Sequence, residues 1–485
     1  MNSKIITTIL ILILFNPIIL GNNTPIYMTY GDHAAKGTTD IINESRILYD
    51  SIVIPSGSSL EIRDSVLDFT HLTDKSIMIE NYGHLNIVNT TIITDLRLNH
   101  SVVISSFGNL SVSISNIVNI KYPIDLSTGA TLVTSAITQD GGELSLFSNY
   151  FENYTTGIIN SNSKVTKLYG NLIKNCSRGF ETQNTNDFGI EYNTFINSFV
   201  HAIDGYGINI TVIGNLIYND LALLMGNSSI NLETKQVTIG IGLTGNYNNF
   251  LNNIVFNTFK GLYTYSSNHT RIENNIFKTS RGIEGELQLQ SVFYSEIRNN
   301  TFVNQWDPIE IYNSKHIVIE DNIIKDASSG IRVEIVDYLK YAQPENYTIR
   351  NNILINAPYT AFSHCKNILI TQNVFNNTEI KIKDGSEFVT FSNNILIMSE
   401  ITVENTKNVS ITENIITSRS WGIMNNGNNV NLVVENNTIK GFGGLLPIPE
   451  QFATIPTLYL IIGFIAFFGI IAFVLIHIII KKVRK

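Results

Sequence analysis

The chain has 485 residues, a formal net charge of −8 and an isoelectric point near 5.6. This acidic balance argues against a nucleic-acid-binding protein, because such a protein needs a basic surface against the phosphate backbone, and basic residues cluster here only in the last five positions. Only two cysteines are present, Cys176 and Cys365, so neither a disulfide framework nor a CxxC metal pair supports the fold.

The N-terminal 21 residues have the layout of a secretory signal peptide. Lys4 precedes an apolar run that extends from Ile5 to Leu20, and the small residue Gly21 follows it. This order predicts a signal peptide over residues 1–21, with an uncleaved N-terminal anchor as the alternative. Residues 22–50 are irregular and polar, and we expect them to cap the repeats that follow.

An Asn followed by two mostly apolar residues recurs along the chain at a nearly constant interval. The key asparagines are Asn149, Asn171, Asn193, Asn215, Asn253, Asn275, Asn300, Asn322, Asn352, Asn373, Asn394, Asn414 and Asn437. Most steps between them are 20–25 residues, and a repeat of this period indicates a solenoid. Before residue 149 the phrase is degenerate, around Asp64, Asn89 and Asn116.

The segments between the asparagines alternate apolar and polar residues over short runs punctuated by Gly and Asn, which are strand and turn signals. The spaced leucines of a leucine-rich repeat are missing, and a propeller blade needs about forty residues. We therefore predict an all-β parallel β-helix over residues 51–440, with three strands per coil and about 14–16 coils. Asn tolerates the left-handed turn conformation, and its amide both donates and accepts, which predicts an internal Asn ladder.

A Gly-apolar pair follows the Asn phrase by seven or eight residues in several repeats. These pairs begin at Gly157, Gly179, Gly261, Gly282, Gly330 and Gly422. Phrase and pair together resemble the right-handed parallel β-helix repeats of the pectin-lyase-like group, in particular the NosD-type and the carbohydrate-binding and sugar-hydrolysis repeats. The resemblance covers roughly residues 50 to 440 and implies a right-handed coil. It does not imply one activity, because the group holds lyases, hydrolases, adhesins and proteins without a known ligand.

Cys176 and Cys365 lie in repeats seven coils apart, or roughly 34 Å at about 4.8 Å per coil. A disulfide needs Cα atoms within about 7 Å, so both thiols are predicted to be unpaired. The two longest steps, of 38 and 30 residues, predict inserted loops around residues 225–247 and 337–345. Such loops often border a binding face.

The C-terminal part predicts a membrane anchor. Residues 441–456 read as a linker rich in Gly and Pro, and residues 457–480 contain no charged side chain. At 1.5 Å per residue this segment extends about 36 Å, enough to cross a bilayer as one helix. The basic tail, residues 481–485, places the C-terminus in the cytoplasm. We expect a single-pass protein of the cell membrane with an exported N-terminal ectodomain, and its fifteen N-x-[ST] sequons suit a glycoprotein.

Aligning the Gly-apolar pairs predicts which residues of one strand per coil point outward, because alternate residues of a strand face opposite sides. The outward positions combine carboxylates and tyrosines. The predicted ligand-binding residues are Glu181, Asp204, Tyr206, Tyr263, Tyr265, Glu284, Glu286, Glu310, Tyr312, Arg332 and Glu334. Tyrosine rings stack on sugar rings and carboxylates bind hydroxyls, so this stripe suits glycan. Outward strand positions are polar in most proteins, however, and Tyr is a common strand residue, which explains the stripe equally well.

The same stripe contains weak candidates for catalysis. Glu284, Glu310, Arg332 and Glu334 suit a retaining glycosidase or a polysaccharide lyase, and Glu284, Glu286 and Glu310 form a possible calcium site. The polygalacturonase pattern of paired Asp with Gly-His-Gly is missing, and a cross-strand ion pair explains Arg332 without catalysis. Nine His, six Met and two Cys are scattered along the chain, which argues against the copper site that a NosD likeness suggests.

From these patterns we expect an anchored ectodomain that binds extracellular glycan or another envelope component. A polysaccharide lyase or glycoside hydrolase using the stripe, and a passive structural stalk, are the alternatives.

Overall fold

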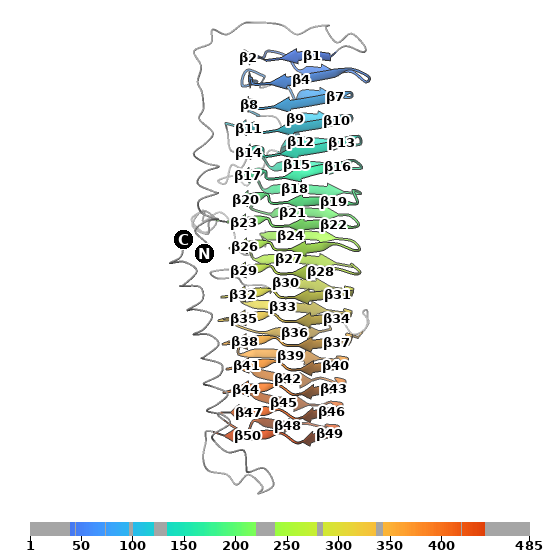
Figure 1. Cartoon of the computed structure of the whole chain (residues 1–485), viewed down its shortest axis with the longest axis vertical. Helices are drawn as coiled ribbons and strands as arrows, with labels where there is room; N and C mark the ends of the chain where they lie inside the picture. The colour runs from blue at the N-terminus through green and yellow to red at the C-terminus, as the bar shows by residue number, and fades with distance from the viewer. Residues whose placement is uncertain are drawn as a thin grey trace, which may run out of the picture.

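The computed structural model describes residues 39–441, except for 44, 73, 97–99, 121–132, 220–237, 279–284, 336–342 and 419. Every regular element within these residues is a β-strand, and the strands form three parallel sheets that run the whole length of one straight solenoid (Figure 1). Each coil contributes one strand to each sheet in turn, and each strand pairs in parallel with the strand three elements later in the chain. The predicted right-handed parallel β-helix, of about sixteen coils, is confirmed.

The strands of sheet A are β1 (Thr39–Ile42), β4 (Ser59–Arg63), β7 (His84–Val88), β10 (Asn109–Ser113), β13 (Glu143–Phe147), β16 (Lys164–Tyr169), β19 (Phe188–Glu191), β22 (Ile210–Ile213), β25 (Asn249–Leu251), β28 (Arg271–Glu273), β31 (Phe293–Arg298), β34 (Lys315–Glu320), β37 (Glu345–Arg350), β40 (Lys366–Thr371), β43 (Glu387–Ser392), β46 (Lys407–Thr412) and β49 (Val430–Glu435).

The strands of sheet B are β2 (Arg46–Ile47), β5 (Val66–Asp68), β8 (Thr91–Thr94), β11 (Asn116–Asn119), β14 (Tyr150–Glu152), β17 (Leu172–Lys174), β20 (Thr194–Ile196), β23 (Leu216–Tyr218), β26 (Ile254–Phe256), β29 (Ile276–Lys278), β32 (Thr301–Val303), β35 (Ile323–Lys325), β38 (Ile353–Ile355), β41 (Val374–Asn376), β44 (Ile395–Ile397), β47 (Ile415–Ser418) and β50 (Thr438–Gly441).

The strands of sheet C are β3 (Ile52–Ile54), β6 (Ile77–Asn81), β9 (Ser101–Ser106), β12 (Thr134–Asp140), β15 (Thr156–Ser161), β18 (Arg178–Gln183), β21 (His201–Tyr206), β24 (Ile239–Thr244), β27 (Lys260–Tyr265), β30 (Gly285–Gln290), β33 (Asp307–Tyr312), β36 (Ile331–Glu334), β39 (Tyr359–Ser363), β42 (Glu379–Lys383), β45 (Glu400–Glu404) and β48 (Ile423–Asn426).

The core is a column of apolar side chains that point inward from all three sheets. Each coil adds its own layer, for example Ile309 and Ile311 from sheet C, Phe302 from sheet B and Ile297 from sheet A, all fully buried. Stacking such layers removes one continuous apolar column from water, and this burial stabilises a fold in which each coil contacts mainly its neighbours. Cys176 and Cys365 are buried in this column as free thiols, as predicted.

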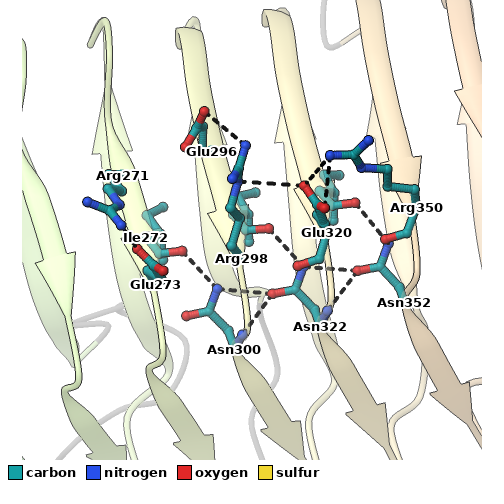
Figure 2. Close-up of polar contacts among 12 residues, drawn as sticks. Arg271, Ile272, Glu273, Glu296, Arg298, Asn300, Glu320, Asn322, Arg350 and Asn352 are labelled. Atoms are coloured by element: carbon teal, nitrogen blue, oxygen red, sulfur yellow. Dashed lines mark hydrogen bonds and ion pairs between the residues drawn. The ribbon is translucent and has the colours of Figure 1, made fainter.

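The predicted Asn ladder is confirmed from Asn149 to Asn437. In its central part, Asn300 Nδ2 donates to the Ile272 carbonyl at 2.9 Å and to Asn322 Oδ1 at 3.0 Å, while the Asn300 backbone N–H donates to the same Oδ1 (Figure 2). In the first coils hydroxyl groups replace the amides, since Ser115 Oγ accepts the backbone N–H of Thr90. The ladder thus satisfies buried backbone groups at the corner between sheets A and B.

Outside this ladder, sheet A carries a chain of ion pairs over consecutive coils (Figure 2). Arg298 lies between Glu296, at 3.1 Å, and Glu320, at 3.7 Å, and Arg350 lies 2.9 Å from Glu320. Opposite charges therefore face each other across neighbouring strands, which favours this register over its alternatives.

The solenoid begins earlier than predicted. Strand β1 already pairs with β4, from Thr39 opposite Ser59 to Ile42 opposite Ile62, so the solenoid includes the second half of the segment predicted as a cap. The signal peptide, most of the linker, the membrane segment 457–480 and the basic tail lie outside the described residues. Within the described residues, no helix has the length and hydrophobicity needed to span a bilayer.

Candidate functional site

The outer face of sheet C brings most of the predicted binding residues into two parallel columns. Parallel pairing places Glu181 beside Asp204 and, in the second column, Gln183 beside Tyr206. Further along, Glu310 lies beside Arg332 and Tyr312 beside Glu334. The residues that the structure brings into these columns, and that the alternation predicted, are Glu181, Asp204, Tyr206, Tyr263, Tyr265, Glu310, Tyr312, Arg332 and Glu334.

In β30, Gln288 and Gln290 occupy these columns in place of the predicted Glu284 and Glu286, and Glu284 lies outside the described residues. Gln288 pairs with both Tyr263 and Glu310, and Gln290 pairs with Tyr265 and Tyr312. From Asn253 to the inward Leu262 is nine residues, whereas from Asn275 to its partner Leu287 is twelve. The three extra residues of this coil therefore all precede Leu287, and the pair Gly282-Ile283, which set the predicted register, lies outside the described residues.

A third outward column was missed by the sequence reasoning. It consists of the first residues of the sheet C strands, among them Arg178, His201 and Lys260, which are in register with one another, and Asp307, which is in register with Gly285. Simple alternation assigns these positions to the core. In β18, however, Gly179 and Phe180 are both buried, and this irregularity turns Arg178 outward. Gly179 is required there, because an added Cβ would lie 2.5 Å from the Ala202 carbonyl oxygen. The recurrent Gly of the Gly-apolar pair is the sequence signal that marks this irregularity.

Four charged or titratable residues of β18 and β21 form the first cluster on this face. Arg178 Nη1 lies 3.3 Å from Glu181 Oε2, and His201 Nδ1 lies 3.4 Å from Asp204 Oδ2. Arg178 Nε is 4.0 Å from the same Asp204 oxygen. Burial raises the pKa of Asp204 and lowers the pKa of His201, so the environment favours the neutral form of each. We call Arg178, Glu181, His201 and Asp204 the β18–β21 cluster.

The second cluster surrounds the guanidinium of Arg332. Its Nη1 donates to Glu310 Oε1 at 2.8 Å and to Asp307 Oδ2 at 3.1 Å, and its Nη2 donates to Glu334 Oε2 at 3.2 Å. The Tyr312 hydroxyl donates to Glu310 Oε1 at 3.0 Å. Ser329 Oγ donates to Asp307 Oδ1 at 2.6 Å, which holds that carboxylate in place. We call Asp307, Glu310, Tyr312, Arg332 and Glu334 the β33–β36 cluster.

Glu310 has the most perturbed carboxyl group of this cluster. Burial, with the nearby Asp307, raises its pKa to about 7, although Arg332 and the Tyr312 hydroxyl act in the opposite direction. Burial also raises the pKa of Tyr312, and the charge of Glu310 adds to that effect. Burial alone would lower the pKa of Arg332, but Glu334, Asp307, Tyr312 and Glu310 together outweigh it and raise that pKa. Glu310 is thus a carboxyl that gains and loses a proton near neutral pH beside a permanent cation.

Four coils separate Asp204 from Glu310, about 19 Å at roughly 4.8 Å per coil. The strands between the clusters carry Tyr263 and Tyr265, followed by Gln288 and Gln290. Lys260 Nζ lies 5.3 Å from the centre of the Tyr263 ring, within the range of a cation–π contact. Amide and aromatic side chains therefore connect two charged clusters on one continuous sheet face.

The calcium prediction rested on Glu284, Glu286 and Glu310 sharing one column. Gln288, a neutral side chain, occupies the place next to Glu310, and Arg332 supplies positive charge on its other side. In the described parts of the chain, no three His, Cys, Asp or Glu side chains are grouped so as to hold a metal ion. Since Glu284 lies outside those parts, calcium binding by that residue stays a prediction.

Comparisons with known proteins agree with this architecture. Residues 206–379 match the family model described as periplasmic copper-binding protein (NosD), which confirms the resemblance to NosD-type repeats. This segment holds Tyr206 and the whole β33–β36 cluster. No curated protein matches the sequence.

The similar solved structures are distant in sequence. Tailspike protein 3 of bacteriophage CBA120 is 8% identical, with a TM-score of 0.33; the match covers 82% of this chain and 59% of the tailspike. PfbA, a surface adhesin of Streptococcus pneumoniae, is 12% identical with a TM-score of 0.33, and coverage is 80% of this chain and 86% of PfbA. The A-module of the Azotobacter vinelandii mannuronan C-5 epimerase AlgE4 is 9% identical with a TM-score of 0.26, and coverage is 84% and 91%.

Proposed function

We propose that this chain is a membrane-anchored cell-surface ectodomain and that the outer face of its sheet C binds extracellular glycan. One observation carries the binding proposal: the rings of Tyr263 and Tyr265 stand on the same sheet face as two charged clusters. Tyrosine rings offer apolar faces to the CH groups of sugars, and the flanking carboxylates, amides and guanidinium groups accept and donate hydrogen bonds to hydroxyls.

The length of this face favours a polymer over a single sugar. Outward side chains that offer a ring, a carboxylate, an amide or a guanidinium group recur on every strand of sheet C from β18 to β36 except β24, along about 29 Å at roughly 4.8 Å per coil. Weak contacts repeated along one chain add up, whereas a monosaccharide would use only one of them.

The binding test uses the full-length protein in detergent and native electrophoresis through gels that contain polygalacturonate, alginate or a neutral β-glucan. Tyr263→Ala with Tyr265→Ala is expected to lower retention at least tenfold on a polysaccharide that retards the wild type. Tyr192→Ala, which removes an exposed tyrosine from another side of the solenoid, serves as the control. Retention that survives the double substitution unchanged contradicts the binding proposal.

Anchoring is supported by the uncharged segment 457–480 and by the basic tail that follows it. The full chain is expected to stay in the membrane fraction at alkaline pH, and a chain that ends at residue 456 is expected to leave it. Release of the full chain at alkaline pH argues against the anchor.

A second candidate function is polysaccharide cleavage by a lyase or hydrolase mechanism, and the pKa of Glu310 near 7 favours it. A carboxyl with such a pKa exchanges protons with a substrate at neutral pH, and Arg332, which pairs with Glu310, is the cation beside it. Release of shorter chains from polygalacturonate or alginate, lost in Glu310→Gln and kept in Arg350→Ala, would establish this activity. Retention without cleavage in the wild type leaves binding as the function.

A further inference from the structure

A column of aromatic and imidazole rings runs along the corner between sheets C and A, apart from the sheet C face. Its members are Tyr247, His269, Tyr294 and His316, one from each of four consecutive coils. The ring centres of Tyr294 and His316 are 4.4 Å apart and nearly parallel, at 5°. His269 contacts Tyr247 and Tyr294 edge to face, at 4.8 Å and 5.4 Å. We call these four residues the corner column.

The backbone at this corner disfavours the two tyrosines that it carries. All four have a left-handed backbone, with φ between 52° and 60°. In adjoining coils the same corner position is held by Asp187, Asn209, Asn346, Asn367, Asn408 and Asn431, residue types that tolerate this conformation. A bulky residue such as Tyr is a true outlier there, and holding it strains the backbone.

In the corner column, ring contacts replace most of the side-chain hydrogen bonds that the neighbouring positions make, although His316 Nδ1 still lies 3.4 Å from Asn346 Nδ2. Asn209 Nδ2 donates to Asp187 Oδ1 at 2.8 Å, and Asn431 Nδ2 donates to Asn408 Oδ1 at 2.9 Å, so the Asn positions form a second ladder. Ring contacts stabilise the column, but each one is worth no more than the backbone strain of the tyrosine that it offsets. Stability therefore does not explain why the ladder changes from amides to rings over four coils.

The rings are accessible to a ligand. Tyr247 and Tyr294 are 53% and 56% exposed. In an edge-to-face contact the edge of one ring covers one face of the other, so three of the four faces of the two rings stay free. The column therefore keeps free ring surface as well as its phenol and imidazole hydrogen-bonding groups. None of its side chains is a carboxylate, ammonium or guanidinium group, in contrast to the two charged clusters of sheet C. The chemistry that it offers is an apolar face alternating with a phenol or imidazole hydrogen-bonding group on each coil, along the solenoid axis.

We propose that the corner column is a second polysaccharide-binding site, specific for a neutral glycan chain that lies along the solenoid axis. The pyranose CH groups contact the ring surfaces, and the sugar hydroxyls bond to the phenol and imidazole tips. The site lies on the coils that carry Tyr263, Tyr265, Glu310 and Tyr312, one corner away, so one long polymer can reach both surfaces. The inference goes beyond the sheet C proposal, because it uses other residues and holds even if sheet C binds nothing.

Phe388 provides a matched control. It occupies the same corner position three coils after His316, with φ of 56° and 48% exposure, but Asn367 and Asn408 flank it. Replacing Phe388 by Asn relieves the same strain without touching the column. Asn209 and Asn346 end the column and begin N-x-[ST] sequons, so the protein for this test is made in cells without N-glycosylation, which leaves no sugar of its own on the column.

The experiment measures binding of a soluble neutral β-glucan and a neutral mannan to the full-length protein in detergent by isothermal titration, together with the thermal unfolding midpoint. Tyr247→Asn with Tyr294→Asn is expected to weaken binding of at least one polymer tenfold or more, at an unchanged or higher unfolding midpoint. Phe388→Asn and the pair Tyr263→Ala with Tyr265→Ala are expected to keep that binding.

Three outcomes overturn the proposal. The first is that the wild type binds neither neutral polymer. The second is that the double corner variant binds as well as the wild type, or that binding is lost only in the sheet C variant. The third is that the double corner variant unfolds at a clearly lower temperature than the wild type while Phe388→Asn does not, which identifies the column as a structural stack.

Discussion

Nη1 of Arg332 donates a hydrogen bond of 2.8 Å to Oε1 of Glu310, on the neighbouring strand of sheet C. The side chain of Glu310 is only 8% exposed, and that of Asp307, the other acceptor of the same nitrogen, is 12% exposed. Arg332 is thus the positive charge that compensates two nearly buried carboxyl groups. Removing the arginine leaves the buried carboxylates without a positively charged partner. This loss lowers the free energy of unfolding far more than the loss of an exposed ion pair does.

Arg332→Ala is therefore expected to lower the free energy of unfolding by about 3 kcal/mol, measured from urea unfolding at pH 8, where Glu310 is ionised. Arg350→Ala removes an exposed arginine that pairs with Glu320, and a much smaller loss is expected. Adding Glu310→Gln to Arg332→Ala should recover part of the loss, because one stranded charge disappears. Equal effects of Arg332→Ala and Arg350→Ala would show that the β33–β36 cluster is not electrostatically coupled.

The contribution of Glu310 to the free energy of unfolding should fall as pH rises from about 4.5 to about 7. Its pKa is raised in the folded protein, to about 7 from an ordinary 4.5, mainly by burial. Between these values the folded chain holds a proton that the unfolded chain has released, so proton binding favours the folded state at low pH and stops doing so above pH 7. Glu310→Gln stays neutral throughout and should flatten this part of the profile. Unfolding midpoints at pH 5, 6, 7 and 8 for both proteins test this, and parallel profiles would contradict it.

The sequence predicts the fold well because the features that build a solenoid repeat. The Asn phrase marks a corner at which the backbone and the amide geometry are the same in each coil, so its spacing counted the coils correctly. In the first coils Ser115 and Thr90 fill this role with a hydroxyl, which has no comparable sequence signature. The exact residue boundaries of the repeats could therefore not be predicted there.

The candidate site was only partly predictable, because outward columns depend on local register. Strict alternation assigns Glu310, Tyr312 and Arg332 correctly. It fails at Arg178, where the buried Gly179 and Phe180 in succession turn the preceding side chain outward, and at Asp307, the first residue of β33. It also fails in β30, where Gly282-Ile283 imitates the Gly-apolar pair and shifts the predicted columns by four residues. The contacts of Arg332 with three carboxyl groups follow only once this register is known.

The register of β30 can be tested by pairing cysteines on the outer face. Gln288 and Glu310 are direct neighbours on parallel strands, about 4.8 Å apart between strands, which is compatible with the Cα separation of a disulfide. Gln288→Cys with Glu310→Cys is expected to oxidise readily, as measured by thiol titration of the denatured protein. The native Cys176 and Cys365 are fully buried and do not compete.

The matched variant for this test is Glu284→Cys with Glu310→Cys, which joins the pair that the sequence pattern alone would place side by side. It is expected to stay reduced under the same conditions. Preferential oxidation of the Glu284 variant would reverse the register assignment and would restore the acidic column from which a calcium site was predicted.

The Asn ladder should contribute more to stability than any single ion pair on the surface. Asn300 Oδ1 accepts the backbone N–H and Nδ2 of Asn275, and its own Nδ2 donates to the Ile272 carbonyl and to Asn322 Oδ1. Asn300→Ala removes all four hydrogen bonds inside the protein and leaves buried donors and acceptors without partners. A loss of about 3–5 kcal/mol in the free energy of unfolding is expected, since each stranded buried group costs about 1–3 kcal/mol.

Asn300→Ser separates the ladder's hydrogen bonds from simple loss of volume. At the equivalent corner, Ser115 Oγ accepts the N–H of Thr90 at 3.1 Å, so a hydroxyl in place of Asn300 can still satisfy the N–H of Asn275. Asn300→Ser should therefore cost less than Asn300→Ala, although both shorten the side chain. Gln290→Ala, which removes an amide from the outer face of sheet C, should cost less than about 0.5 kcal/mol. Urea unfolding of the three variants measures these differences, and equal losses for Ser and Ala at position 300 would mean that packing rather than hydrogen bonding holds this corner.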